Sequence, residues 1–229
     1  KINKPNFTPR CTEHIDDIIA FIADLINDGF AYESNKSVFF SIEKFKKYGK
    51  LSGKNIDDLL AGHRVDVNTD KNNPMDFVLW KPSKMDDPGW DSPWGFGRPG
   101  WHIECSAMSD KILGQNIDIH GGGIDLLFPH HENEIAQSES RSSSSFSNFW
   151  VHNNLINFDN QKMSKSLGNI IKGRDFIKEY NAEILKFIIL SVHYRSILNF
   201  NKKIINQTII NLIKIYSSLE TSDKICKLN

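Results

Sequence analysis

The clearest indication of the fold class is the stretch Asn116-Ile117-Asp118-Ile119-His120, which is followed by Gly121-Gly122-Gly123. Isoleucine alternates with polar residues over its first five positions, which predicts a β-strand over 116–120. Glycines directly after a strand let a flat ligand lie close to the backbone, although a tight turn would explain them equally well. A helix is predicted next, near 130–138. Strand, glycine turn and helix in this order are typical of an α/β fold.

The same alternation of elements continues on both sides of this stretch. A helix is predicted near 105–113, and short strands are predicted at 149–151 and 155–158. Alternating strands and helices over 89–165 indicate half of an open parallel sheet. From Gly173 onward the chain is predicted to be helical, with isoleucine and leucine recurring at helical spacing up to Leu219.

The N-terminal part reads as a small α+β module over 1–88. Isoleucines recur at helical spacing over 15–26, and Gly29 stands where a helix commonly ends. A hairpin is predicted over 31–40, with further strands at 64–67 and 77–80. Residues 88–101 are rich in Gly, Pro and Trp, which excludes regular helix and predicts a loop anchored by its aromatic side chains.

Composition narrows the class of protein. The chain has 28 Lys and Arg against 28 Asp and Glu, so bulk charge gives no sign of nucleic-acid binding. Its 3 cysteines are too sparse for a disulfide framework, which favours a reducing compartment such as the cytoplasm. No apolar stretch reaches the ~18 residues of a membrane span. An RNA partner would need a local basic face, for which the candidates are Lys172, Arg174, Lys178, Lys186, Arg195, Lys202, Lys203 and Lys214.

Three residues form a candidate metal set. His130 and Glu134 stand one helical turn apart, so a regular helix would present both to one ion, and Cys105 lies upstream. Cysteine, histidine and carboxylate are all acceptable Zn²⁺ ligands. The same residues also fit an ordinary helix surface and a small buried thiol.

A second candidate is the loop Lys162-Met163-Ser164-Lys165-Ser166. Two cations and two hydroxyls before a helix are suited to holding a triphosphate and following its developing charge. An exposed polar loop has the same composition. An acidic residue after the glycine run, Asp125, is placed to accept from ribose hydroxyls.

Together these segments resemble the class I aminoacyl-tRNA synthetases, and within them the cysteinyl-tRNA synthetase family. Lys162–Ser166 matches the class's KMSKS signature at every position. Gly97–Met108, Asp118–Gly123 and Phe128–Glu134 are similar to segments of that family, as is His193–Ser196. The resemblance implies a Rossmann-type catalytic fold in which 1–88 is the connective insertion, 89–165 the second half of the fold, and 166–229 the stem-contact region leading into a helical bundle.

The resemblance also implies the reaction and its participants. A zinc ion would be held by Cys105, His130 and Glu134 together with a cysteine outside this chain, near a HIGH motif that is also absent. Trp101 and His120 would lie near L-cysteine. ATP, with Mg²⁺, would be bound by Gly122, Gly123, Asp125, Lys162, Ser164 and Lys165, the two lysines being the catalytic candidates. The expected partner is tRNA(Cys), with the protein a cytoplasmic monomer.

Two other functions fit these residues. One is an ATP-dependent ligase on the same scaffold that joins cysteine to an amino sugar instead of tRNA. The other is a non-catalytic fragment that binds only zinc or RNA. The helical region after 175 favours the synthetase over the first, and the complete KMSKS signature argues against the second.

Overall fold

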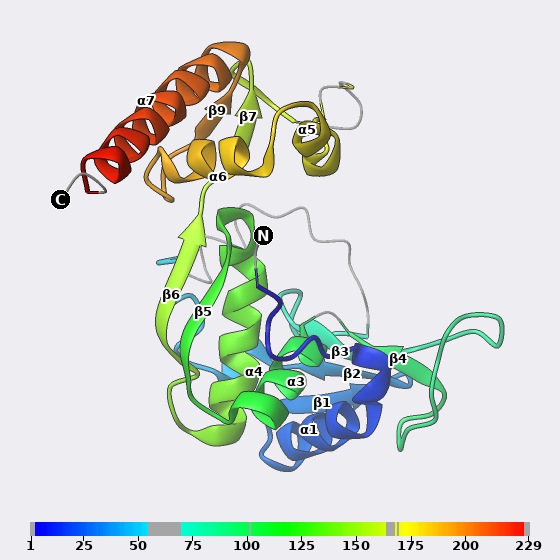
Figure 1. Ribbon diagram of the computed structural model, residues 1–229. Helices are drawn as coiled ribbons and strands as arrows, with labels where there is room; N and C mark the ends of the chain where they lie inside the picture. The colour runs from blue at the N-terminus through cyan, green and yellow to red at the C-terminus, as the bar shows by residue number, and fades with distance from the viewer. Residues whose placement is uncertain (1–2, 55–69, 101, 164–167, 169, 227–229) are drawn as a thin grey trace. The chain divides into compact units, whose positions relative to one another are not determined.

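The computed structural model describes residues 3–54, 70–100, 102–163, 168 and 170–226 (Figure 1). The chain divides into two compact units, Lys4–Val151 and His152–Asn229, called here the larger and the smaller unit. In the described residues, no helix combines the length and the apolar character needed to cross a membrane.

The larger unit begins with a short 3₁₀ turn, η1 (Cys11–Glu13), and helix α1 (Ile15–Asn27). The isoleucine periodicity predicted α1 correctly, because Ile18, Ile22 and Leu25 are fully buried on one face. Gly29 follows the helix at φ +77°, a left-handed conformation that suits glycine at a helix end.

A four-stranded antiparallel sheet follows, in the order β1 (Ala31–Ser34), β2 (Ser37–Phe40), β3 (Phe77–Pro82) and β4 (Gly97–Pro99). The predicted hairpin is confirmed as β1 and β2, whereas the strand predicted at 64–67 lies outside the described residues. A 3₁₀ turn, η2 (Ile42–Lys44), leaves β2. Trp80 of β3 is fully buried, and Trp94 lies with its ring centroid 5.8 Å from that of Trp80, which confirms an aromatic anchor in the Gly- and Pro-rich loop.

Next come α3 (Ile103–Leu113) and β5 (Ile117–Gly123), and β5 pairs with β6 (Ser147–Asn153). The α/β class is confirmed. The prediction of a turn at the three glycines was wrong: β5 continues through Gly123, and positive φ angles occur at none of the three. At Gly122, glycine is needed for close approach rather than for a turn.

Helix α4 (Glu132–Ser142) starts later than the sequence predicted. A 3₁₀ turn, η3 (Ile124–Leu126), and a π-type turn, η4 (Leu127–His131), precede it. Phe128, inside this turn, has extended backbone angles of φ −138° and ψ 132°. Helix α4 itself therefore begins at Glu132, two residues later than predicted, and His130 lies in the π-type turn before it. The expectation that His130 and Glu134 present their side chains to one ion stays a prediction.

Arg141, near the end of α4, connects α4 to two other helices. Its Nε donates to Asp24 Oδ2 of α1 at 2.7 Å, and its Nη1 donates to Asp110 Oδ2 of α3 at 2.6 Å. Its guanidinium carbon also lies 4.6 Å from the centre of the Phe21 ring. Figure 1 shows α1, α3 and α4 gathered in this unit.

The smaller unit combines a three-stranded sheet with helices. Strand β7 (Ile156–Phe158) pairs antiparallel with β8 (Gln161–Lys162) and parallel with β9 (Leu198–Phe200). Its helices are α5 (Gly173–Glu179), α6 (Ala182–Leu190) and α7 (Lys202–Cys226). The helical prediction is confirmed for these three helices, with a break before α6 at which Asn181 Oδ1 accepts from the Glu183 amide at 3.0 Å. It was wrong for 198–200, where the chain forms β9 because it pairs with β7.

The core of the smaller unit is formed by Phe176, Ile188, Leu198, Phe200 and Ile205. The eight basic residues proposed for an RNA face all belong to this unit, and all of them are exposed.

Candidate functional site

Buried polar side chains converge where β5 meets the start of α4. His120 of β5, His131 at the end of η4 and Glu134 of α4 offer ligand atoms that all lie within 4.8 Å of one another. His120 Nε2 is 3.2 Å from Glu134 Oε2. That contact lacks hydrogen-bond geometry, so Glu134 Oε2 is buried without a hydrogen-bond partner among the described residues. A buried oxygen of this kind is a natural ligand for a cation.

Aromatic rings fix the orientation of the two histidines. The His120 ring centroid lies 4.6 Å from that of His131 and 4.5 Å from that of Trp150, while Phe146 closes the group at 5.4 Å from His120. Gly122 makes room for this packing, because a Cβ at Gly122 would lie 2.7 Å from His131 Cε1. The requirement for glycine here comes from the His131 ring.

A second pair of histidines lies at the start of α3. His130 Nδ1 is 3.3 Å from His102 Nε2, and the two ring centroids are 4.8 Å apart. His102 is buried, and its φ of 87° is a strained, left-handed conformation for a residue other than glycine. Burial, followed by the neighbouring His130, lowers the pKa of His102 to about 4. Sequence reasoning missed His102, although it lies within the Gly97–Met108 segment.

Cys105 lies one turn beyond His102 on α3 and is exposed. Even so, the surrounding protein partly desolvates the thiol, and together with the charges of Glu134, Glu104 and Cys11 it raises the pKa of Cys105 to about 12. Burial, followed by the charge of Glu104, raises the pKa of Glu134 to about 8. The two carboxyl groups and the thiol thus form a region where a positive charge would be stabilised.

The donor set fits a divalent metal, and in particular zinc. Imidazole nitrogens, a buried carboxylate oxygen and a nearby thiol are the ligands that Zn²⁺ takes in proteins. The predicted ligands were Cys105, His130 and Glu134. Of these, only Glu134 is in the tight cluster of described residues, whose other members are His120, predicted near the substrate, and His131, which the sequence prediction did not match to a ligand.

The nucleotide candidates fall in several places. Gly122 and Gly123 are the last residues of β5, and Asp125 lies exposed in η3. Lys162 is an exposed residue of β8 in the smaller unit, where it pairs with Asn157. The other predicted residues, Trp101, Ser164 and Lys165, lie outside the described residues. Trp150, which contacts His120, was missed, and its only sequence signal was its position in a predicted strand.

Comparison with known families gives a match over most of the chain. The family described as "tRNA synthetases class I (C) catalytic domain" matches residues 1–210. A solved structure described as an arginyl tRNA synthetase from Campylobacter jejuni has a TM-score of 0.54 and 16% sequence identity, covering 87% of this chain and 36% of that one. At that identity the likeness concerns the fold alone.

Curated relatives named cysteine–tRNA ligase are considerably more similar in sequence. The protein from Bdellovibrio bacteriovorus is 54% identical over 218 residues, covering 95% of this chain and 45% of the relative. The protein from Clostridioides difficile is 53% identical, covering 96% of this chain and 47% of the relative. The protein from Nitrosomonas europaea is 54% identical, covering 94% of this chain and 47% of the relative. The chain therefore spans less than half the length of the curated relatives it matches.

Proposed function

Because the chain belongs to the family of class I (C) tRNA synthetase catalytic domains, we propose that it forms part of an ATP-dependent cysteine–tRNA ligase. The reaction has two steps. The carboxylate of L-cysteine attacks the α-phosphate of ATP to give cysteinyl-adenylate and pyrophosphate, and the cysteinyl group then passes to the terminal adenosine of tRNA(Cys). Positioning and charge stabilisation dominate such a reaction, since few protein groups form bonds in it.

One observation carries this proposal: the buried Glu134 carboxylate lies against two imidazoles and close enough to Cys105 to influence its thiol. This is a donor set for a soft metal, on a chain whose relatives are named for cysteine. Bound Zn²⁺ would supply a soft Lewis acid that favours a thiolate over the hydroxyl of serine. A site that requires one specific polar contact rejects an analogue lacking it strongly, without a second editing site.

We assign the metal to Glu134, with Cys105 and His130 as the other ligands of this chain. His120 and Trp150 would then form the wall against which the substrate lies, with Trp101 beside them. The grouping of His120 and His131 with Glu134 supports a second arrangement, in which these imidazoles hold the ion. Separate replacement of His130 and His131 distinguishes the two arrangements.

The remaining roles concern ATP and the parts of the fold. Gly122, Gly123 and Asp125 would contact the adenosine, while Lys162, Ser164 and Lys165 would hold the phosphates, with Mg²⁺ as the counter-ion. The two lysines would stabilise the departing pyrophosphate. Residues 1–88 would be the connective insertion, 89–165 the second half of a Rossmann-type fold, and 166–229 the stem-contact region, whose exposed basic residues suit an RNA backbone.

The test uses the protein completed to the length of its relatives. Purified material should contain one zinc per chain, should exchange pyrophosphate into ATP with cysteine but not with serine, and should charge tRNA(Cys). The absence of bound zinc, or equal exchange with serine, would refute the proposal. Acceptance of an amino sugar in place of tRNA would establish the alternative ligase instead. A cytoplasmic monomer is the expected state, and light scattering after size-exclusion chromatography measures its mass.

A further inference from the structure

The first turn of α4 contains three consecutive buried polar residues. Glu132, Asn133 and Glu134 are 0%, 5% and 5% exposed. Residues in a helix are separated by about 100°, so Glu132 and Glu134 point about 200° apart, to nearly opposite sides. Glu134 faces the candidate metal site. A buried carboxylate is costly without partners, so Glu132 must find them on the other side of the helix.

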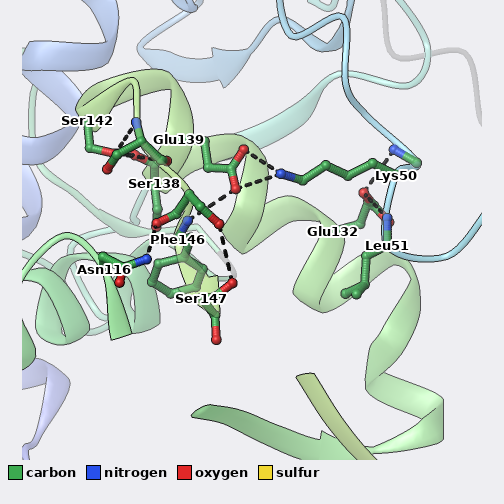
Figure 2. Close-up of polar contacts among 12 residues, drawn as sticks. Lys50, Leu51, Asn116, Glu132, Ser138, Glu139, Ser142, Phe146 and Ser147 are labelled. Atoms are coloured by element: carbon green, nitrogen blue, oxygen red, sulfur yellow. Dashed lines mark hydrogen bonds and ion pairs between the residues drawn. The ribbon is translucent and has the colours of Figure 1, made fainter. Parts of the chain in front are cut away.

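Those partners are backbone amides of a segment far away in sequence. Gly49 N donates to Glu132 Oε1 at 2.9 Å across 83 residues, and Leu51 N donates to the same oxygen at 3.3 Å. Ser52 N donates to Oε2 at 3.0 Å. Figure 2 shows the Glu132 carboxylate directed at this backbone beside Leu51. Both carboxylate oxygens are therefore held, and Glu132 binds the segment as an anchor.

Two more contacts attach the same segment, Tyr48–Ser52, to α4. The Tyr48 hydroxyl donates to Asn133 Oδ1. Lys50 Nζ donates to both oxygens of Glu139, at 2.7 and 2.6 Å, as Figure 2 shows. Tyr48 is buried, and its ring makes an edge contact with Phe128 of the π-type turn at 6.3 Å between centroids. We call Tyr48–Ser52 the anchored segment. The anchored segment contacts α4 at the first turn of the helix and again two turns further along, at Glu139.

The start of α4 depends on such external contacts. Its N-cap residue, His131, makes no side-chain capping hydrogen bond, and the preceding turn includes the non-helical Phe128. Local backbone structure reaches back only as far as Pro129, whose carbonyl accepts from the Glu132 amide, and stops at Phe128. Contacts from outside the helix therefore share in fixing the rotation of its first turn. With side chains about 5 Å from the helix axis, a rotation of about 20° moves the Glu134 carboxylate by about 2 Å. Metal–ligand distances tolerate only about 0.2 Å.

We infer that Glu132 is a positioning residue for the metal site: by holding the anchored segment it sets the rotation of the first turn of α4, and with it the direction of Glu134 and His131. The inference rests on the proposed function for its metal. Glu132 itself faces away from the candidate metal site, toward the anchored segment. Its role is carried by three backbone hydrogen bonds on the opposite side of the helix.

Three variants test this inference, each made in the protein completed to the length of its relatives. Glu132→Ala removes all three bonds. Glu132→Gln retains one carbonyl oxygen for Gly49 and Leu51 but turns an amide donor toward the Ser52 N–H. Lys50→Met is the matched control, because it removes a contact of the same segment with α4 while leaving the first turn untouched.

Zinc affinity is measured by competition with a chromophoric chelator, amide exchange by mass spectrometry, and imidazole chemical shifts by NMR of the metal-free protein. Glu132→Ala should weaken zinc binding about 10–100-fold, as loss of a residue that orients ligands does. It should also abolish protection of the 49–52 amides and shift the His120 and His131 signals. Glu132→Gln should give an intermediate loss. The zinc affinity of Lys50→Met should stay within about twofold of the wild-type value, and its imidazole chemical shifts should be unchanged.

Several outcomes would overturn the inference. In the first, Glu132→Ala is folded and its 49–52 amides are unprotected, yet its zinc affinity and its imidazole chemical shifts are unchanged. In the second, Lys50→Met loses as much zinc affinity as Glu132→Ala, which would indicate a general loss of contact between the anchored segment and α4 rather than positioning by Glu132. If Glu132→Ala does not fold, Glu132→Gln and the control decide in the same way. A wild-type chain that binds no zinc contradicts the proposed function, and the metal-free imidazole shifts then still test the role of Glu132.

Discussion

Replacement of Gly122 by alanine should displace His131 and weaken metal binding. A Cβ at this position would lie 2.7 Å from His131 Cε1, 3.1 Å from His131 Nε2 and 3.2 Å from Leu126 Cδ1. The strand at Gly122 has no positive φ, so the added methyl group is compatible with the backbone. Its effect therefore comes from collision with the imidazole.

The size of the effect follows from these distances. Carbon atoms in contact are about 3.5–4.0 Å apart, so the His131 ring must move by about 1 Å or rotate away. Crowding of this kind costs about 1–3 kcal/mol in stability. If His131 contributes to the cation site, a shift of about 1 Å exceeds the tolerance of a metal–ligand bond several-fold. We expect zinc affinity to fall at least about tenfold, equivalent to about 1.4 kcal/mol.

Gly121→Ala is the matched control. Among the described residues, a Cβ at Gly121 would meet only the Val151 carbonyl oxygen, at 3.6 Å, which is ordinary contact. Chelator competition without ATP measures both variants, and urea unfolding measures their stability. A folded Gly122→Ala chain with the zinc affinity of Gly121→Ala would refute the reasoning, because His131 would then play no part in the site.

Three further predictions follow from the site, the core and the titration of one tyrosine. His131→Ala and His130→Ala should differ in zinc stoichiometry. Loss of zinc only in His130→Ala supports the predicted ligand set, and loss of zinc only in His131→Ala supports the cluster around Glu134. Ile22→Ala should lower the free energy of unfolding by about 2–5 kcal/mol, whereas Leu113→Ala, at a side chain 61% exposed, should change it by less than about 0.5 kcal/mol, as urea titration would show. Burial raises the pKa of Tyr32 from 10.0 to about 12. The neutral Tyr32 side chain therefore contributes stability below pH 10, and this contribution is lost as the pH rises to about 12. Between these pH values the urea midpoint should fall less in Tyr32→Phe than in the wild type, and an equal fall in both proteins would contradict the prediction.

Most elements of the fold could be predicted from the sequence because their patterns are local. The isoleucines of α1 repeat at helical spacing, and the two-residue turn at Asn35 and Lys36, with φ of 46° and 61°, joins strands rich in β-branched and aromatic residues. The glycines of β5 were misjudged because glycine permits both turn and strand, and the deciding contact with His131 comes from another element.

The candidate site was predicted only in part. Glu134 belongs to the cluster of possible ligands, whereas the spacing argument for His130 assumed a regular helix and His130 lies in the π-type turn before α4. The ligand set itself stays a prediction. Which of two adjacent histidines faces the carboxylate depends on where the helix starts, and no local signal fixes that start. Glu132 carries no chemical signature in sequence, because its partners are backbone amides 83 residues earlier.

Arg141 links α1, α3 and α4 at the end of α4 remote from the candidate metal site. Its two charge-assisted bonds resist sliding of any helix past the others. Rearrangements between β5 and α4 are therefore expected in the backbone of η3 and η4 and in the first turn of α4, while the ends of the three helices at Arg141 stay together.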